Sequence, residues 1–104
     1  MSRVQRVDLQ LATGEDRTCV WAGEVTRIMR VRLQPRESLP PHDAEADVVL
    51  IPLAGKLRFA DEEGEQVWGV GEGLALACGA PMNISNPGDE PAVFIVVRTP
   101  PAEA

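Results

Sequence analysis

Short stretches in which apolar and polar residues alternate run through most of the sequence. Residues 25–33 are the clearest example, because Val25, Met29, Val31 and Leu33 fall on one face when every second residue is counted. A period of two is typical of a β-strand with one buried face. The pattern therefore predicts a strand over this range.

Other strands are predicted from the same alternation, or from short apolar runs bounded by turn residues. They cover residues 4–11, 19–22, 48–53, 57–59, 66–70, 74–76, 82–85 and 92–99. The first of these is expected at a sheet edge. No segment keeps a helical period for more than about three turns, so no βαβ unit is expected.

Glycine and proline mark the boundaries between these stretches. The chain has nine of each in 104 residues, above the usual combined share of about 12%. Many short strands with such punctuation predict an all-β sandwich or small barrel. The length predicts a single domain over residues 1–104, with a frayed tail over residues 100–104.

The charge balance argues against nucleic acid as a partner. The net charge is −6, whereas binding to phosphates relies on clustered Lys and Arg. One local basic cluster contains Arg27, Arg30, Arg32 and Arg36. The strand period favours a solvated face for that cluster. The acidic stretch 61–65 is likewise interpreted as a solvated hairpin loop.

The N-terminal residues, the lengths of the apolar runs and the two cysteines indicate the cellular location and the redox state of the thiols. The first ten residues lack the apolar core of a signal peptide, and no apolar run approaches the 18 residues that suggest a membrane span. Cys19 and Cys78 do not have the spacing of a metal site. We therefore expect a cytoplasmic protein with reduced thiols and no membrane partner.

Residues 35–55 hold the densest group of chemically active side chains. They include the only histidine, His42, and three carboxylates spaced two apart, Asp43, Glu45 and Asp47. In a strand these carboxylates would point away from His42, and in a loop they could converge on it. A solvated acidic rim is favoured over a displaced metal site.

The same stretch resembles the first motif of the cupins, a family of small jelly-roll barrels. That motif is written G-x5-H-x-H-x3,4-E-x6-G. His42 takes the first histidine position and Gly55 the closing glycine. Arg36, Ala44 and Val48 stand at the positions of the first glycine, the second histidine and the glutamate.

A second stretch resembles the second cupin motif, G-x5-P-x-G-x2-H-x3-N. Gly71, Gly79 and Asn86 match its glycines and asparagine. Ala77 replaces the proline and Met82 the histidine. Two motifs in the expected order imply a fold more strongly than either motif alone.

The two matches, about residues 35–55 and 71–86, imply a small single-domain cupin. The expected fold is an RmlC-like jelly roll, also described as a double-stranded β-helix barrel. Because this fold hosts many unrelated activities, the resemblance implies no substrate.

The resemblance also implies where a metal would bind. Metal-binding cupins use three histidines and one carboxylate, and only His42 remains of that set, because Ala44, Val48 and Met82 occupy the other positions. No cofactor is predicted, and a divalent transition metal is disfavoured. His42 is the candidate catalytic residue, as an acid–base group or hydrogen-bond donor. A relic held by a backbone carbonyl is an equal alternative.

Structural roles are predicted for the other distinctive side chains. Met82 is interpreted as a pocket filler, and Cys78 as a small buried hydrophobe. Trp21 and Trp68 are expected in core or interface packing. Asn86 is expected to fix the following turn through its side chain.

Three functions remain open. The favoured one is a metal-free cupin that binds a small, mostly apolar molecule inside the barrel. Its pocket would be lined by Met29, Val31, His42, Ala44, Val48, Leu50, Leu76, Met82, Ile84 and Phe94. The second is a small enzyme, either an isomerase or epimerase or a metal-dependent oxygenase with a non-standard ligand set. The third is a dimeric structural or regulatory module with a filled barrel.

A homodimer is predicted for any of these functions. Small jelly-roll domains leave edge strands that need covering. Proteins that this chain resembles commonly pair through a sheet face or by exchanging N-terminal strands. The candidate segments are Val93–Val97 and Val4–Leu11.

Overall fold

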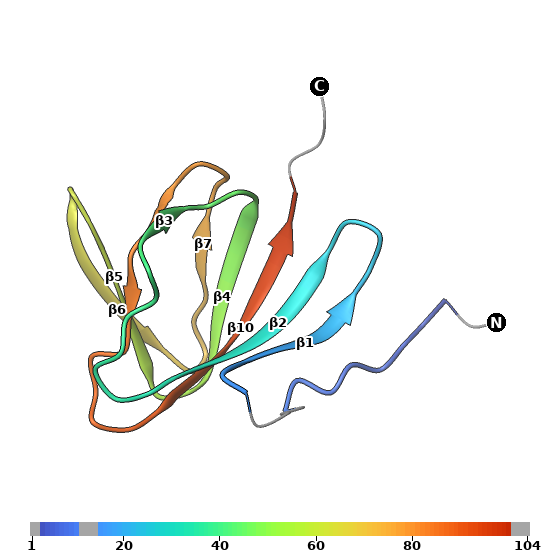
Figure 1. Cartoon of the computed structure of the whole chain (residues 1–104), viewed down its shortest axis with the longest axis horizontal. Helices are drawn as coiled ribbons and strands as arrows, with labels where there is room; N and C mark the ends of the chain where they lie inside the picture. Colours follow the sequence, from blue (N-terminus) through green and yellow to red (C-terminus); the bar gives the residue numbers. More distant parts are fainter. Residues whose placement is uncertain (1–2, 11–14, 101–104) are drawn as a thin grey trace.

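The computed structural model describes residues 3–10 and 15–100. These residues form ten β-strands and no helix (Figure 1). The strands are β1 (Arg17–Ala22), β2 (Arg27–Leu33), β3 (His42–Asp43), β4 (Asp47–Ala54), β5 (Lys56–Asp61), β6 (Gly64–Gly69), β7 (Leu74–Leu76), β8 (Pro81–Met82), β9 (Ile84–Ser85) and β10 (Ala92–Thr99). The all-β prediction is confirmed. None of the described residues belongs to a helix that is long and apolar enough to cross a membrane.

The strands are arranged in two layers (Figure 1). The larger layer is an antiparallel five-stranded sheet in the order β1-β2-β10-β4-β7. Opposite it lie the three-stranded ladder β6-β5-β9 and the two-stranded ladder β3-β8. Only Asn83 separates β8 from β9, so these two ladders continue one another along the chain.

Strand β4 shows how the sequence pattern positions the core. The apolar run 48–53 predicts a buried strand, but only alternate residues are buried. Val48 and Leu50 are 5% and 0% exposed, whereas Val49 and Ile51 are 36% and 38% exposed. Successive side chains of a strand point to opposite faces, and only the inner face of the larger sheet meets the second layer.

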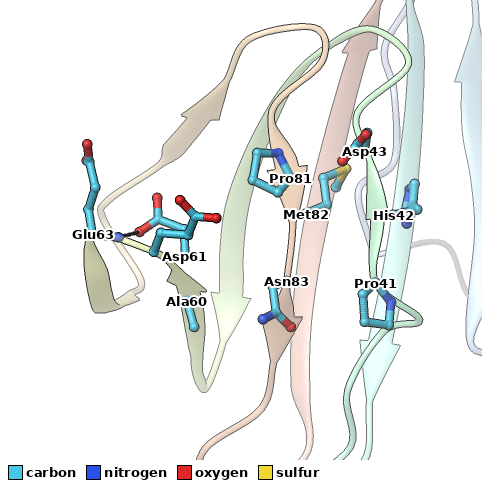
Figure 2. Close-up of a pocket in the computed structure, with 10 residues that line it drawn as sticks. Pro41, His42, Asp43, Ala60, Asp61, Glu63, Pro81, Met82 and Asn83 are labelled. Carbon is cyan, nitrogen blue, oxygen red and sulfur yellow. Dashed lines mark hydrogen bonds between the residues drawn. The ribbon is translucent and has the colours of Figure 1, made fainter.

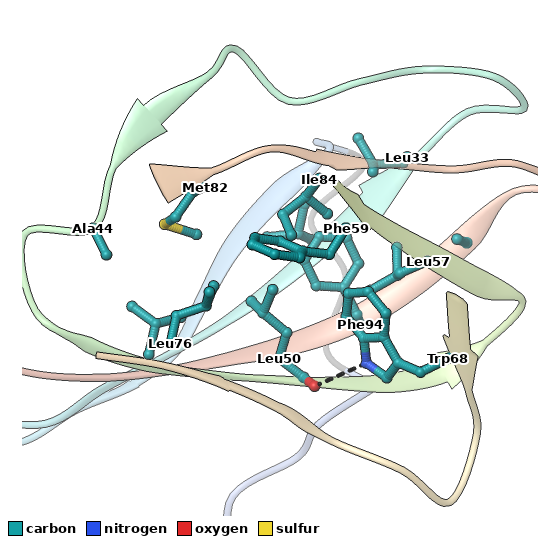
Figure 3. Close-up of a cluster of buried hydrophobic side chains, with 13 residues drawn as sticks. Leu33, Ala44, Leu50, Leu57, Phe59, Trp68, Leu76, Met82, Ile84 and Phe94 are labelled. Atoms are coloured by element: carbon teal, nitrogen blue, oxygen red, sulfur yellow. Dashed lines mark hydrogen bonds between the residues drawn. The ribbon is translucent and has the colours of Figure 1, made fainter. Parts of the chain in front are cut away.

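Apolar side chains from both layers fill the space between them (Figure 3). Burying one such Leu, Ile or Phe side chain stabilises the fold by about 1.5–3 kcal/mol. The Trp68 indole N–H donates a hydrogen bond to the Leu50 carbonyl at 3.3 Å, so its polar atom is satisfied inside the core. The core comprises Val31, Leu33, Ala44, Val48, Leu50, Leu57, Phe59, Trp68, Leu76, Met82, Ile84, Ala92 and Phe94.

Gly55 makes the turn between β4 and β5. Its φ angle is +78°, a conformation that residues with a Cβ rarely adopt. A Cβ at this position would also lie 3.1 Å from both the Ala92 Cα and the Pro91 carbonyl oxygen. The closing glycine of the first motif is therefore required by the backbone.

The predicted edge strand over residues 4–11 is wrong for the part that the structure describes. Residues 4–10 form no strand, and the last residue of the range lies outside the described residues. Val4 and Leu9 are 85% and 38% exposed and Val7 is half-buried, so this segment has no fully buried apolar face. Most of the predicted frayed tail, residues 101–104, also lies outside the described residues.

The other predicted strands are present, most of them with shifted ends. The strand predicted over residues 25–33 begins at Arg27, because the Gly23 N–H donates to the Thr26 carbonyl at 2.8 Å and closes a turn. The range 82–85 is divided between β8 and β9. Strand β10 matches its predicted bounds and lies between β2 and β4, so both of its edges are paired.

Candidate functional site

The short strand β3 brings the two motif regions together. It pairs antiparallel with β8, so that His42 lies opposite Met82 and Asp43 lies opposite Pro81. Cross-strand partners project to the same face of a ladder. The first histidine position of one motif therefore lies beside the histidine position of the other, as the cupin resemblance implies.

His42 is exposed at the end of the proline-rich loop. Its Nδ1 lies 3.0 Å from the Pro40 carbonyl oxygen. A carbonyl only accepts hydrogen bonds, so this contact requires a protonated Nδ1. The contact matches the interpretation of a histidine held by a backbone carbonyl. It leaves Nε2 for a ligand, and a catalytic role for His42 stays a prediction.

The four positions of a cupin metal site do not fit a divalent ion in this chain. Ala44, Val48 and Met82 belong to the core cluster, and Figure 3 shows Ala44 and Met82 at one end of it. Neither Ala44 nor Val48 has a donor atom, and a thioether is a soft ligand that mainly suits Cu(I). No three His, Cys, Asp or Glu side chains gather as a metal site within residues 3–10 and 15–100. The expected lack of a resident metal stays a prediction.

The three carboxylates that follow His42 diverge. The Asp47 carboxylate accepts a hydrogen bond from the Cys78 backbone N–H at 2.9 Å. Glu45 lies 3.4 Å from the Arg98 guanidinium. Asp43 instead lines a groove. The carboxylates therefore do not converge on one point.

That groove is the main hollow beside His42, with a volume of about 810 Å³. Figure 2 shows Asp43 and Met82 on one side of it, and Asp61 and Glu63 of the β5–β6 hairpin on the other. The lining comprises Pro41, His42, Asp43, Ala60, Asp61, Glu62, Glu63, Pro81, Met82 and Asn83. Four of these residues are carboxylates and none is Lys or Arg, so the groove is acidic.

The hairpin wall of the groove is held in place by its own backbone. The Asp61 carboxylate accepts a hydrogen bond from the Glu63 N–H at 2.9 Å, which fixes the turn between β5 and β6. Glu62 lies between them and is exposed. The sequence predicts only a solvated hairpin here. Its one signal for a site is the density of negative charge.

The predicted pocket residues lie mainly in the core. Met29 packs against the core and is partly buried, and His42 is exposed at the groove. Only His42 and Met82 of the predicted set line the groove. All members of the predicted set other than Met29 and His42 are buried, namely Val31, Ala44, Val48, Leu50, Leu76, Met82, Ile84 and Phe94.

Asn86 joins three segments of backbone and is 2% exposed. Its Nδ2 lies 3.3 Å from the Leu33 carbonyl oxygen, 3.1 Å from that of Gln34 and 2.7 Å from that of Glu90. Its Oδ1 accepts a hydrogen bond from the Gly88 N–H at 2.9 Å. The prediction that Asn86 fixes the following turn is confirmed, and its contacts extend to the end of β2.

Other predictions for single residues have mixed outcomes. Cys78 is exposed, so its predicted burial is wrong; it lies on the loop before β8, outside the core cluster. Cys19 is also exposed, and both cysteines are free. Trp68 is a core residue as predicted, and Met82, interpreted as a pocket filler, also belongs to the core cluster. Trp21 is half-buried on β1.

Arg36 shows a feature that the sequence does not reveal. It stands at the first glycine position of the motif, and its φ angle is +66°. Glycine adopts this region readily, whereas other residues do so at a cost. The Arg36 guanidinium lies 2.8 Å from the Asp89 carboxylate, with both groups largely exposed. The turn therefore keeps a glycine-type backbone without a glycine.

Two antiparallel layers closed around one core define a small β-helix type of barrel. No protein-family model matches the chain, and a comparison with curated proteins found no match. An RmlC-like cupin family protein with a double-stranded β-helix fold from Methanocaldococcus jannaschii is similar in structure, with a TM-score of 0.79 and 17% identity over 96% of this chain and 94% of that one. A cupin domain from Bordetella pertussis gives a TM-score of 0.69 and 23% identity, over 82% and 92% of the two chains.

A sugar phosphate isomerase from a cupin superfamily, from Silicibacter pomeroyi, is also similar. Its TM-score is 0.66 and its identity 26%, over 83% of this chain and 60% of that one. The chain therefore forms a small cupin domain with the RmlC-like double-stranded β-helix fold. The predicted fold is confirmed. The roles of these similar proteins vary or are unknown, so the similarity defines no specific activity.

Proposed function

We propose that this cupin domain binds a small molecule with an apolar body and a positively charged end. The site is the groove between the β3–β8 ladder and the β5–β6 hairpin. One observation carries the proposal: apolar side chains and four carboxylates line the same groove. The proposal retains a metal-free binding role and moves the ligand from the barrel interior to its rim.

The size and lining of the groove support a ligand of this chemistry. Its volume of about 810 Å³ lies within the range of about 300–1,000 Å³ that is usual for small-molecule sites. Pro41, Pro81 and Met82 offer apolar contact, while Asp43 and the hairpin carboxylates set a negative potential. Such a potential raises the local concentration of cations.

The barrel interior is a less favourable location. Leu50, Ile84 and Phe94 are 0% exposed, so a ligand there would have to displace packed side chains. This filling supports a structural module as the alternative if the groove binds nothing.

The chemistry of the sugar phosphate isomerase is not carried over to this chain. A phosphate group is usually bound by Arg, Lys or backbone N–H groups. In this groove a phosphate would meet four carboxylates and no Lys or Arg side chain. His42 would be the one side chain there able to carry a positive charge.

A pair of probes with the same apolar body tests the proposal. Hexylamine is protonated at pH 7, and 1-hexanol is neutral. We expect hexylamine to raise the melting temperature of the protein, hexanol to raise it less, and glucose 6-phosphate to leave it unchanged, because a ligand that binds only the folded state stabilises it. Added salt should weaken the effect of hexylamine.

Two substitutions locate the binding site. Asp43→Asn and Glu62→Gln should each raise the Kd for hexylamine by about 5-fold, which corresponds to the loss of one exposed charge contact. Glu24→Gln, on the β1–β2 turn away from the groove, is the matched control. Equal effects of hexanol and hexylamine, insensitive to both substitutions, would place the ligand in the interior. No binding of either probe would favour the filled-barrel module.

A further inference from the structure

The basic cluster of the sequence is divided between the two faces of the larger sheet. On β2, Arg30 and Arg32 lie on the outer face, because they alternate with the core residue Val31. Arg27, four residues before Val31, lies on the inner face. It stands at the start of the strand and is exposed. One arginine of the cluster therefore projects to the same side as the core.

A second arginine stands directly opposite Arg27. The register pairs Arg27 with Arg98 of β10, and both residues are exposed. Directly opposite residues of antiparallel strands project to one face with their Cβ atoms about 4.5–5.5 Å apart, and like charges in such a pair are destabilising. The two guanidinium groups therefore favour a negative charge between them.

The charge of this pair is only partly balanced within the chain. The Arg98 guanidinium lies 3.4 Å from the carboxylate of Glu45, whose side chain is 82% exposed. Arg27 takes part in no salt bridge within residues 3–10 and 15–100. Two positive groups and one negative group leave one net positive charge, which a single monoanion would neutralise.

Apolar side chains adjoin the two arginines. Val96 and Met29 form the next inner pair of the same register, and both are partly buried against the core. On the other side of Arg27, its partner on β1 is Ala22, which is small and exposed. Figure 1 shows β1 and β2 on the side of the molecule away from the β5–β6 hairpin. This face therefore offers apolar contact next to the positive charge and is accessible from the β1 side.

We infer that Arg27 and Arg98 bind a small monoanionic carboxylate with a short apolar body, independently of the cation groove. The planar guanidinium fork matches the geometry of a carboxylate, and the apolar body lies along Val96 and Met29. Glu45 is an internal competitor, because its carboxylate already approaches Arg98. A phosphate dianion is a weaker ligand, since it carries more charge than the site neutralises and brings no apolar contact.

A titration of the full chain with hexanoate, followed by NMR at pH 7 and constant ionic strength, tests the inference. Hexanoate should shift the backbone amide signals of residues 27–29 and 96–98, and the titration gives its Kd. Acetate has the same charge and a shorter body, and inorganic phosphate has no apolar body, so each should bind at least about 5-fold more weakly. Unchanged signals at about 100 mM hexanoate would overturn the site. Tighter binding of phosphate than of hexanoate would overturn the carboxylate class.

Substitutions separate a defined site from general charge attraction. Arg27→Gln should raise the hexanoate Kd by about 5-fold, as expected for the loss of one exposed charge contact. Arg32→Gln is the matched control, because it makes the same change in net charge on the opposite face of the same strand, and it should leave the Kd unchanged. Equal effects of the two substitutions would overturn the inference.

The competitor gives a change of opposite sign. Glu45→Gln should lower the hexanoate Kd by about 2- to 5-fold, because it frees Arg98, and an increase in the Kd would contradict the assignment. Asp43→Asn, in the cation groove, should leave the hexanoate Kd unchanged. An altered Kd in this variant would place hexanoate in the groove and overturn the separate site.

Urea denaturation of the same variants distinguishes a ligand site from a structural role. Because the two arginines repel each other, Arg27→Gln should leave the urea midpoint unchanged or raise it. A lower midpoint would assign Arg27 a structural role and overturn the inference.

Discussion

Cupin motif positions lie at two ends of this barrel, around Asn86 and around His42. The two ends differ in whether a polar motif side chain is buried and hydrogen-bonded to the backbone. At one end Asn86 is buried and its amide contacts the backbone of β2 and of the β9–β10 connection. At the other end His42 is exposed, while Ala44 and Met82 have joined the core. The position that fixes backbone still carries a buried polar side chain. Of the positions that would hold a metal, three now carry no nitrogen or oxygen ligand.

The difference has a simple physical origin. A buried amide that is satisfied on both sides cannot be removed without leaving its backbone partners unpaired. The side chains at the other three ligand positions, Ala44, Val48 and Met82, make no hydrogen bond to the backbone, so an apolar side chain fills each of these positions and gains stability from burial. In this chain the motif residue that hydrogen-bonds to the backbone is needed for the fold, whereas the ligand positions can be filled by apolar side chains when no metal is bound.

Removing the Asn86 side chain should produce the largest effect. Asn86→Ala leaves the carbonyls of Leu33, Gln34 and Glu90 without this donor, and we expect a loss of about 2–4 kcal/mol in the free energy of unfolding. Urea denaturation measures it. Asn83→Ala, at an exposed position between β8 and β9, should cost under about 0.5 kcal/mol. Similar values for both variants would contradict the structural role of Asn86.

A substitution at Gly55 tests whether the backbone conformation at the end of the first motif also contributes to stability. Gly55→Ala should lower the free energy of unfolding by about 1–3 kcal/mol, through both a positive φ and a close approach to Ala92. Gly71 has a φ angle of +97° and open space around it. Gly71→Ala should therefore show the conformational cost alone, about 1 kcal/mol. The difference between the two melting curves measures the close contact, and equal losses would show that the contact costs nothing.

Arg36 allows the reverse test, in which glycine is introduced at a motif position that already has a positive φ angle. Arg36→Gly relieves a positive φ but adds freedom to the unfolded chain, so we expect a net gain of at most about 1 kcal/mol in stability. Arg36→Ala removes the exposed contact with Asp89 and keeps the strained φ. Its stability should stay near that of the wild type. A similar loss of stability in Arg36→Gly and Arg36→Ala would mean that the Arg36 side chain matters more than its backbone conformation.

The smallest effect is expected at His42. Because its ring is exposed and bonded only to the nearby Pro40 carbonyl, His42→Ala should change the free energy of unfolding by less than about 0.5 kcal/mol. Thermal denaturation is sufficient to measure this. A large loss would show that the His42 end is as structural as the Asn86 end.

The fold was predictable because its signals are local. The apolar run over Val48–Leu53, the turn at Gly55 and the turn residue Asn86 each lie within one short stretch of sequence. The edge strand over residues 4–11 failed for the same reason, since alternation predicts a strand only where a neighbouring sheet accepts it. In the structure Val4 remains exposed.

The groove was much less predictable. It forms where Asp43, next to His42, comes near Asp61 and Glu63, which belong to a hairpin of the same layer. Neither segment is distinctive without the other. Their proximity depends on the ladders β5–β9 and β3–β8, which link distant parts of the chain.

The position of β10 has a consequence for how the chain folds. This strand forms the middle of the larger sheet, and its register partners on β2 lie about 60 to 70 residues earlier in the sequence. The sheet cannot assemble until residues 92–99 have been synthesised, and closing such long loops slows folding. During translation β2 and β4 would each expose an unpaired edge, and these edges are the sites where a nascent chain would recruit a chaperone or aggregate.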